Sequence, residues 1–359
     1  MRQVLLRINL ADPWSLEPIG GVQGIGSGYL LLMGLLVWLA MTAWEYRRTK
    51  GFLFGSLIMP AIAVGLVLFL ADRTPPMMRN GLPIFGYGVM VFCGFLFGGW
   101  SALRRADKIG WDRQLIWDLI PWIFIAGIAG ARIFYLATKD VYSGVRGVGD
   151  FVFRSVNLTD GGLVLLGGVI AVAVAVIAFC IKRRISPLAM GDLIIPSFFI
   201  GLGFGRLGCL MNGCCFGDRC SLPWAIHFPQ ESAAWGALYV RGYLGEAATM
   251  TYGLHPTQIY SSITAFLLAA LTAAFFWRRP FEGSVLVLGM LLYSIQRFLI
   301  EFLRGDEFGQ LGTIFTPSQL ISGAIFVAGL TLWGVLSWMR SRPDHVITRW
   351  VDKHAAVTT

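Results

Sequence analysis

The run GLVLLGGVIAVAVAVIAFCI, residues 162–181, contains no charged side chain. A helix rises about 1.5 Å per residue, so roughly 20 apolar residues cross a bilayer core about 30 Å thick. A helix that is apolar on every face is typical of a membrane span rather than of a soluble domain. The run therefore predicts a transmembrane helix, and its glycine pair, Gly167–Gly168, permits a neighbouring helix to approach closely.

Eight further stretches share this length and apolarity, at residues 27–46, 52–71, 83–103, 114–136, 187–208, 256–277, 283–303 and 317–338. Hydrophobic residues make up 56% of the chain and charged residues 14%, against about 25% charged in a typical soluble domain. No remaining segment is large enough to fold alone as a soluble domain. We therefore expect an all-α, polytopic integral membrane protein with about nine transmembrane helices and a small external head segment.

Basic residues concentrate in alternate loops. With nine spans and the N-terminus outside, the inward segments, including the loop from Arg104 to Arg113, hold about 16 of the 29 lysines and arginines. Cytoplasmic loops are enriched in Lys and Arg, so the C-terminus is expected in the cytoplasm. Residues 1–26 lack the apolar run of a cleavable signal peptide, so the first span should remain as an anchor. The net charge of +9 follows from this topology and requires no nucleic-acid partner.

The spans fall into three parts along the chain. Residues 1–80 carry two extra spans poor in polar residues, and we interpret them as an appendage that docks or stabilises. Residues 81–340 form the main membrane domain, within which residues 209–255 are too polar to be embedded in lipid and form the external head segment. Residues 341–359 are expected to be a cytoplasmic tail.

Four polar residues share one side of the predicted span 283–303. Tyr293, Arg297, Glu301 and Arg304 are spaced four, four and three residues apart, which keeps them on one helical stripe. A charged residue at the bilayer centre costs about 2.5–3.5 kcal/mol. These charges should therefore face a bundle interior or a wet cavity. A structural Arg297–Glu301 ion pair would leave Arg304 unexplained, so we favour a functional role.

Two further arginines lie inside predicted spans. Arg206 is flanked by Gly205 and Gly208, so a bulky head group could reach its guanidinium, and Arg132 follows Gly130. The planar guanidinium fork suits phosphate oxygens. Several inward-facing arginines with one acidic partner leave net positive charge, which an anion such as a phospholipid phosphate would balance.

Tyr87 and His255 lie near the ends of predicted spans, and each has a structural explanation as well as a functional one. Tyr87 stands at the start of the span 83–103, where interface tyrosines are common. His255 precedes Pro256 and Thr257 at the start of the span 256–277, where it also suits a helix N-terminus.

These pieces, in this order, resemble the prolipoprotein diacylglyceryl transferase family over roughly residues 81–340. No single motif would be decisive, and it is their number and order that identify the family. The matching segments are Tyr87–Gly88, Arg104–Asp107, Gly130–Arg132, Asp160–Leu163, Gly205–Gly208 with Asn212–Gly213, Pro223–Ala225 through Pro229, His255–Gln258, the stripe from Tyr293 to Arg304, and Ser318–Gln319.

The resemblance implies a reaction at a bacterial inner membrane. Phosphatidylglycerol donates its diacylglyceryl group to the lipobox cysteine of a prolipoprotein signal peptide, glycerol phosphate leaves, and a thioether remains. The implied catalytic residues are Arg206, Arg297, Tyr87 and Glu301. The implied phosphatidylglycerol-binding residues are Arg206, Arg297, Tyr293, Asn212, Arg304 and His255. No metal or organic cofactor is required, and membrane lipid and signal peptides are the expected partners.

The chain departs from the family pattern at two positions. The family has a histidine in the segment Gly–Gly–Leu–x–x–His–Gly–Gly, and here Leu166 stands at that place. Many members also have asparagine where this chain has Cys209. The first departure leaves open the identity of any general base and permits a divergent relative without the activity.

Two other classes of protein remain as alternatives. Cys209, Cys214, Cys215 and Cys220 could bind zinc or form a disulfide such as Cys220 with Cys209 or Cys214. The spacing C-x₄-C-C-x₄-C differs from usual zinc patterns and favours a disulfide. A lipid-binding or transport protein without chemistry is the other alternative, because intramembrane Arg/Glu pairs also mark transport paths. Transporters usually show repeated halves, and no such repeat is visible in this sequence.

Overall fold

The structure, a computed structural model, describes residues 4–9, 12, 14–18, 21–49, 81–138, 147–156, 162, 164–230, 232–305 and 315–340. The predicted span 52–71, the predicted tail 341–359 and most of the segment Asp160–Leu163 lie outside these residues. The chain forms two compact units, one from Met1–Cys93 and Phe204–Ile259 and the other from Gly94–Gly203 and Tyr260–Thr359.

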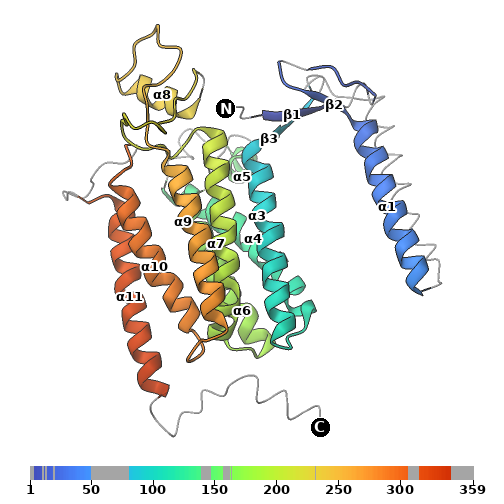
Figure 1. Ribbon diagram of the computed structural model, residues 1–359, viewed down its shortest axis with the longest axis vertical. Helices are drawn as coiled ribbons and strands as arrows, with labels where there is room; N and C mark the ends of the chain where they lie inside the picture. The colour runs from blue at the N-terminus through green and yellow to red at the C-terminus, as the bar shows by residue number, and fades with distance from the viewer. Residues whose placement is uncertain are drawn as a thin grey trace. The chain divides into compact units, whose positions relative to one another are not determined.

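Seven described helices are long and apolar enough to cross a membrane. They confirm seven of the nine predicted spans, and the all-α polytopic class, by length and composition. The first predicted span is also helical, in α1 (Ser27–Thr49). The seven are α3 (Gly86–Lys108), α4 (Arg113–Thr138), α6 (Leu165–Arg183), α7 (Pro187–Asn212), α9 (Thr257–Phe276), α10 (Ser284–Glu301) and α11 (Pro317–Arg340) (Figure 1).

A small sheet that the sequence did not predict lies in the first unit. Strand β1 (Val4–Asn9) pairs in parallel with β2 (Gly24–Gly26) and antiparallel with β3 (Leu82–Phe85). The strands are short, and β1 and β3 are separated by most of the N-terminal extension, so no hairpin pattern reveals them. β3 runs directly into α3, and the sheet therefore fixes the start of the helix that carries Tyr87.

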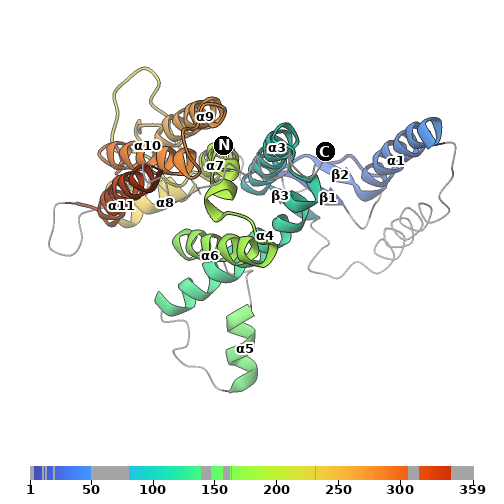
Figure 2. The ribbon, with the colours of Figure 1, turned by 90° about the horizontal axis from the view of Figure 1, so that it is seen from below.

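Within the second unit, α4 packs on α6 and α10 packs on α11 (Figures 1 and 2). The α4–α6 contact depends on glycine. A Cβ on Gly130 would lie 2.2 Å from the Cβ of Ala171, and one on Gly167 would lie 2.2 Å from the Cβ of Phe134. Side chains at these positions would force the helices apart, which confirms the close approach predicted for Gly167.

The head segment contains a short helix, α8 (Ala233–Val240), and its own small core. Ser232 caps α8 by accepting a hydrogen bond from the Trp235 N–H at 3.1 Å. The buried residues of this core are Phe216, Phe228, Ala234, Leu238 and Leu254. The head segment is therefore folded around a packed core of its own.

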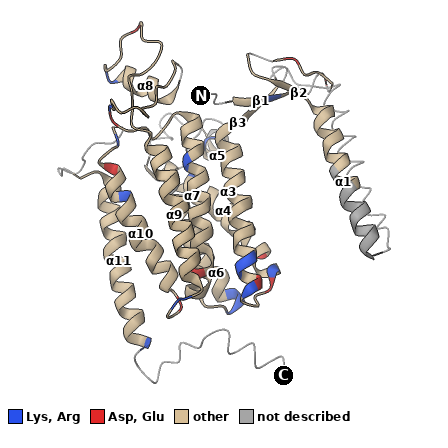
Figure 3. Ribbon diagram, in the orientation of Figure 1, with Lys and Arg blue, Asp and Glu red and all other residues tan. Residues whose placement is uncertain are grey.

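Basic residues occupy the last turns of two helices of the second unit, with Arg105 and Lys108 on α3 and Lys182 and Arg183 on α6 (Figure 3). Arg105 is an exception to its predicted place in an inward loop. Because α3 continues to Lys108, Arg105 lies on the helix and is 5% exposed. Its guanidinium donates to the Leu193 carbonyl at 3.1 Å and to the hydroxyls of Ser101 at 2.8 Å and Ser197 at 2.6 Å. Arg105 thus links α3 to α7 by hydrogen bonds to uncharged oxygen atoms.

Asp192 of α7 holds the start of α10. Its carboxylate is fully buried and accepts backbone N–H groups from Gly283 at 2.8 Å, Val285 at 2.9 Å and Leu286 at 2.9 Å. The first N–H groups of a helix lack intrahelical partners, and the helix dipole favours a negative charge there. Asp192 thus fixes the position of the helix that carries Arg297 and Glu301.

Replacing Asp192 with alanine is expected to lower the free energy of unfolding by about 2–4 kcal/mol, because buried N–H groups would lose a charged acceptor. Asp192→Asn keeps one oxygen acceptor and should lose less. Thermal unfolding of the purified protein measures both. Glu246→Ala, an exposed change in the head segment, is the control and should cost less than about 0.5 kcal/mol. An Asp192→Ala protein as stable as this control would show that α10 does not depend on the carboxylate.

Candidate functional site

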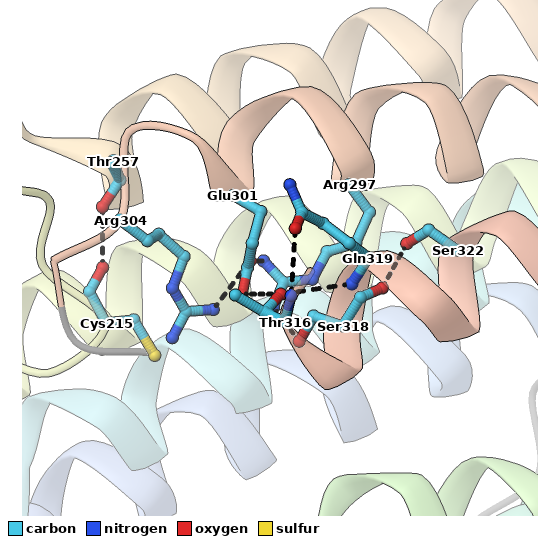
Figure 4. Close-up of polar contacts among 9 residues, drawn as sticks. All are labelled: Cys215, Thr257, Arg297, Glu301, Arg304, Thr316, Ser318, Gln319 and Ser322. Carbon is cyan, nitrogen blue, oxygen red and sulfur yellow. Dashed lines mark hydrogen bonds and ion pairs between the residues drawn. The ribbon is translucent and has the colours of Figure 1, made fainter. Parts of the chain in front are cut away.

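One buried carboxylate in the second unit contacts two guanidinium groups. Glu301 Oε2 lies 2.7 Å from Arg297 Nη1 and 3.8 Å from Arg304 Nη1 (Figure 4). The Glu301 side chain is fully buried, and those of Arg297 and Arg304 are 12% and 8% exposed. The charged residues of the stripe therefore face the protein interior, as the helical spacing predicted. Arg304 does not reach out to solvent, and this trio carries one net positive charge.

The start of α11 completes this cluster. Arg297 Nη2 donates to Ser318 Oγ at 2.7 Å, and Thr316 Oγ1 donates to Glu301 Oε1 at 2.9 Å. Thr316 and Gln319 also hydrogen-bond each other's backbone N–H groups, at 3.3 and 3.0 Å, in a capping box. Sequence reasoning missed Thr316, although Thr–Pro–Ser–Gln before an apolar run is the signal of such a box.

Tyr87 and Arg206 form the centre of a second cluster, in the first unit. Tyr87 is the second residue of α3, and its ring lies against α7, where a Cβ on Gly208 would be 2.9 Å from Tyr87 Cδ2. Arg206 is half-buried on α7, within electrostatic range of the Tyr87 hydroxyl. Among the described residues, no hydrogen bond or ion pair engages the Arg206 guanidinium. A half-buried intramembrane cation without a carboxylate partner favours an anionic ligand.

Three cysteines lie at the end of α7 beside these residues. The Sγ atoms of Cys209, Cys214 and Cys215 all lie within 4.8 Å of one another. Cys214 lies beyond the end of α7, and the pKa of its thiol is below the usual range. The main cause is a hydrogen bond from the Cys209 thiol to the Cys214 sulfur, and a hydrogen bond from Cys215 is the second cause. Cys220 is not in this group, and its Sγ accepts the Leu222 N–H at 3.4 Å. All six cysteines are free, so the predicted disulfide with Cys220 was wrong.

The remaining predicted site residues lie at the end of α7, just before α9 and on α10. Asn212 ends α7 and hydrogen-bonds the Cys214 thiol. The His255 backbone N–H donates to the Asp218 carbonyl at 2.9 Å, and the His255 carbonyl accepts the N–H of Thr257, the first residue of α9, at 2.8 Å. Tyr293 packs on Phe199, with ring centroids 6.4 Å apart.

Arg132 has a different role from the one predicted. Its guanidinium donates to the backbone carbonyls of Arg154 at 2.5 Å, Ser155 at 3.0 Å and Gly162 at 3.1 Å. Gly162 has a positive φ of 86°, and a Cβ there would lie 2.6 Å from Arg132 Nη1. Arg132 therefore holds the chain on either side of the segment that precedes α6, and it is committed to carbonyl oxygens instead of an anion.

The sequence that contains these clusters is similar to proteins of one family. A model of the prolipoprotein diacylglyceryl transferase family matches residues 75–335. A phosphatidylglycerol–prolipoprotein diacylglyceryl transferase of Clostridium perfringens is 31% identical over 255 residues, covering 71% of this chain and 92% of that protein. One of Rhodopirellula baltica, with the same description, is 36% identical over 424 aligned positions, covering 85% of this chain and 84% of that protein.

Proposed function

This chain belongs to the prolipoprotein diacylglyceryl transferase family, and from that premise we propose how its own residues carry out the transfer. The donor is phosphatidylglycerol, and the acceptor is the lipobox cysteine of a prolipoprotein signal peptide. The cysteine sulfur bonds to the glyceryl carbon as that carbon's bond to the phosphate oxygen breaks. The electron pair leaves with glycerol phosphate, the thiol proton is released, and a thioether remains.

The main support for this proposal is the environment of Arg206. Its guanidinium is half-buried on a membrane-spanning helix, and no described carboxylate pairs with it. Negative charge develops on the departing phosphate, and pre-positioned donors aimed at such charge usually make the largest single contribution to catalysis. Gly205 leaves open space next to Arg206 for a head group, while the Tyr87 ring fills the space at Gly208. The Tyr87 hydroxyl, within electrostatic range of Arg206, can orient the glycerol.

The Arg297–Glu301 pair is proposed to supply the second cation. Glu301 holds the Arg297 guanidinium at 2.7 Å, and Ser318 holds it from α11. A guanidinium fixed by two partners needs no reorganisation as the leaving group gains charge, which is what electrostatic stabilisation requires. Glu301 and Ser318 are thus positioning residues, while Arg297 contacts the substrate.

The direction of each helix along the chain supports one orientation in the membrane. Arg206 lies in the C-terminal part of α7, whose first residue follows the basic turn Lys182–Arg184, and Tyr87 lies at the opposite end of α3 from Arg105 and Lys108. Arg297 lies in the C-terminal half of α10. We propose that the basic turns face the cytoplasm of a bacterial inner membrane, so the reaction occurs towards the outer face.

The proposed orientation is testable by labelling. A cysteine introduced at Ser186, between α6 and α7, should resist an impermeant thiol reagent in intact cells and react after permeabilisation. A cysteine at Ser221 in the head segment should react without permeabilisation. The chain with its six native cysteines is the background control. Labelling of position 186 from outside would invert the topology and move both clusters to the cytoplasmic side.

A genetic test addresses the function itself. The gene for this chain, expressed in a bacterium depleted of its own diacylglyceryl transferase, is expected to restore growth and the lipid modification of a reporter lipoprotein. A reporter whose lipobox cysteine is replaced by serine should remain unmodified. Full-length protein that inserts in the membrane and yet leaves the reporter without lipid would show that the chain has lost the family reaction.

Activity is expected to survive the leucine at position 166. A cysteine thiol with a pKa of about 8.5 is already a few per cent thiolate near neutral pH. Leu166→His should therefore change the rate by less than about tenfold, against the 10²–10⁴ typical of a positioned base. A pH–rate profile of both proteins measures this, with Tyr87→Phe as a third arm that should lose any basic limb due to the phenol. An inactive wild type rescued by Leu166→His would contradict the expectation.

A further inference from the structure

The backbone conformation at the end of α7 brings the thiols of Cys209, Cys214 and Cys215 together. Cys209 lies in the last turn of α7, and Cys214 and Cys215 follow the helix end. Gly213 with φ of 72° and Cys215 with φ of 59° turn the chain back. The Cys214 N–H then bonds the Cys209 carbonyl at 3.1 Å. This reversal brings the three sulfurs to one point.

The first residues of α9 hold the turn in place. Gln258 Nε2 donates to the Cys214 carbonyl at 2.8 Å. Thr257 Oγ1 donates to the Cys215 carbonyl at 2.8 Å (Figure 4). The two donors are 1% and 2% exposed. Buried hydrogen bonds to both carbonyls fix the backbone that carries two of the three sulfurs.

The arrangement matches three corners of a tetrahedral thiolate site. Zinc–sulfur bonds of about 2.3 Å place neighbouring sulfurs roughly 3.8 Å apart, close to the separation limit of 4.8 Å that the three Sγ atoms satisfy. Three protein ligands with one open position are the pattern of catalytic zinc, whereas structural zinc has four. One zinc ion and three thiolates carry a net negative charge, and Arg206, one helical turn before Cys209, is placed to balance it.

We propose that Cys209, Cys214 and Cys215 bind one zinc ion whose fourth position receives the thiol of the lipobox cysteine. This rests on the proposed function and adds to it the means of activating the nucleophile. A thiol that binds zinc releases its proton to water, so the sulfur arrives as a thiolate. The sulfur's electron pair forms the C–S bond, the C–O bond breaks, and glycerol phosphate leaves with the electron pair of that C–O bond. Such activation needs no general base, which fits a chain with Leu166 at the family's histidine position.

Metal content tests the site directly. Full-length protein purified under reducing conditions and equilibrated with zinc should retain about one zinc per chain by elemental analysis. Cys209→Ser and Cys215→Ser should each weaken zinc binding at least about 100-fold, with thermal unfolding measured alongside. Cys220→Ser is the matched control, because Cys220 is a nearby buried cysteine outside the group. Cobalt in place of zinc should give sulfur-to-cobalt charge-transfer absorption in the wild type and the control.

Transferase activity of the same samples separates the outcomes. Chelation of the zinc should reduce transfer at least about 100-fold, and added zinc should restore it. A reduced wild type that transfers the diacylglyceryl group and retains no zinc overturns the metal site and leaves the proposed function intact. A wild type that retains one zinc and transfers nothing overturns the proposed function, and with it the role given to the fourth position.

Discussion

Arg206→Ala is expected to lower the rate of diacylglyceryl transfer by at least about 10²–10³, the typical cost of removing one donor to a developing negative charge. The guanidinium is half-buried on α7 and lacks an acidic partner among the described residues, so its removal should leave a folded protein. Initial rates with phosphatidylglycerol vesicles and a lipobox peptide measure the effect. Arg206→Lys keeps the charge without the planar fork and should recover part of the activity.

Arg104→Ala is the matched control for this experiment. Arg104 lies near the C-terminal end of α3, at the opposite end of that helix from Tyr87, and its guanidinium stacks over Trp100 at 4.0 Å. Its loss should leave transfer within about twofold of wild type. An Arg206→Ala protein that keeps more than half of the wild-type rate would show that Arg206 does not contact the leaving group.

Arg297→Ala is expected to cause a loss of similar size, about 10²–10³ in rate. The reason differs from that for Arg206, because Arg297 is held by Glu301 and Ser318. Glu301→Gln should lower the rate mainly through misplacement of that guanidinium. The double variant, Arg297→Ala with Glu301→Gln, should be no slower than Arg297→Ala alone, since residues acting as a unit are not additive. The effects should fall on kcat more than on KM.

The double-mutant comparison decides whether the pair acts in catalysis or only in folding. A buried ion pair that loses one partner leaves an uncompensated charge, at a cost of about 3–5 kcal/mol. Unfolding must therefore be measured on every variant. Arg297→Ala protein with an unchanged unfolding midpoint and wild-type kcat would assign the pair to packing alone. Effects on rate that multiply in the double variant would instead show that Arg297 and Glu301 act independently.

Spans and charge placement were predictable because each follows from local chemistry. Long apolar runs predict helices by length, and the four-residue spacing of Arg297 and Glu301 places both on one side of α10. Arg105 and Arg132 could not be interpreted in the same way. Their partners are backbone carbonyls and serine hydroxyls on other segments, such as Leu193 and Gly162, and such partners leave no mark in the sequence.

The cysteine cluster and the sheet depended on contacts that spacing does not show. C-x₄-C-C suggested a disulfide with Cys220, but the positive φ of Cys215 and the hydrogen bond from Gln258 select a different set of three thiols. β1 and β3 pair across most of the N-terminal extension. Thr316 differs from these examples, because the pattern Thr–Pro–Ser–Gln predicts its capping box with Gln319.

The central claim is that this chain transfers a diacylglyceryl group from phosphatidylglycerol to a cysteine thiol without a histidine at position 166. Mass spectrometry of a lipobox peptide, after incubation with the purified full-length protein in vesicles, tests this most directly. With phosphatidylglycerol present, the peptide should gain the mass of one diacylglyceryl group on its cysteine, and glycerol phosphate should appear in equal amount. Vesicles of phosphatidylethanolamine alone should leave the peptide unchanged. A peptide of unaltered mass in phosphatidylglycerol vesicles, with folded wild-type protein, would contradict the account.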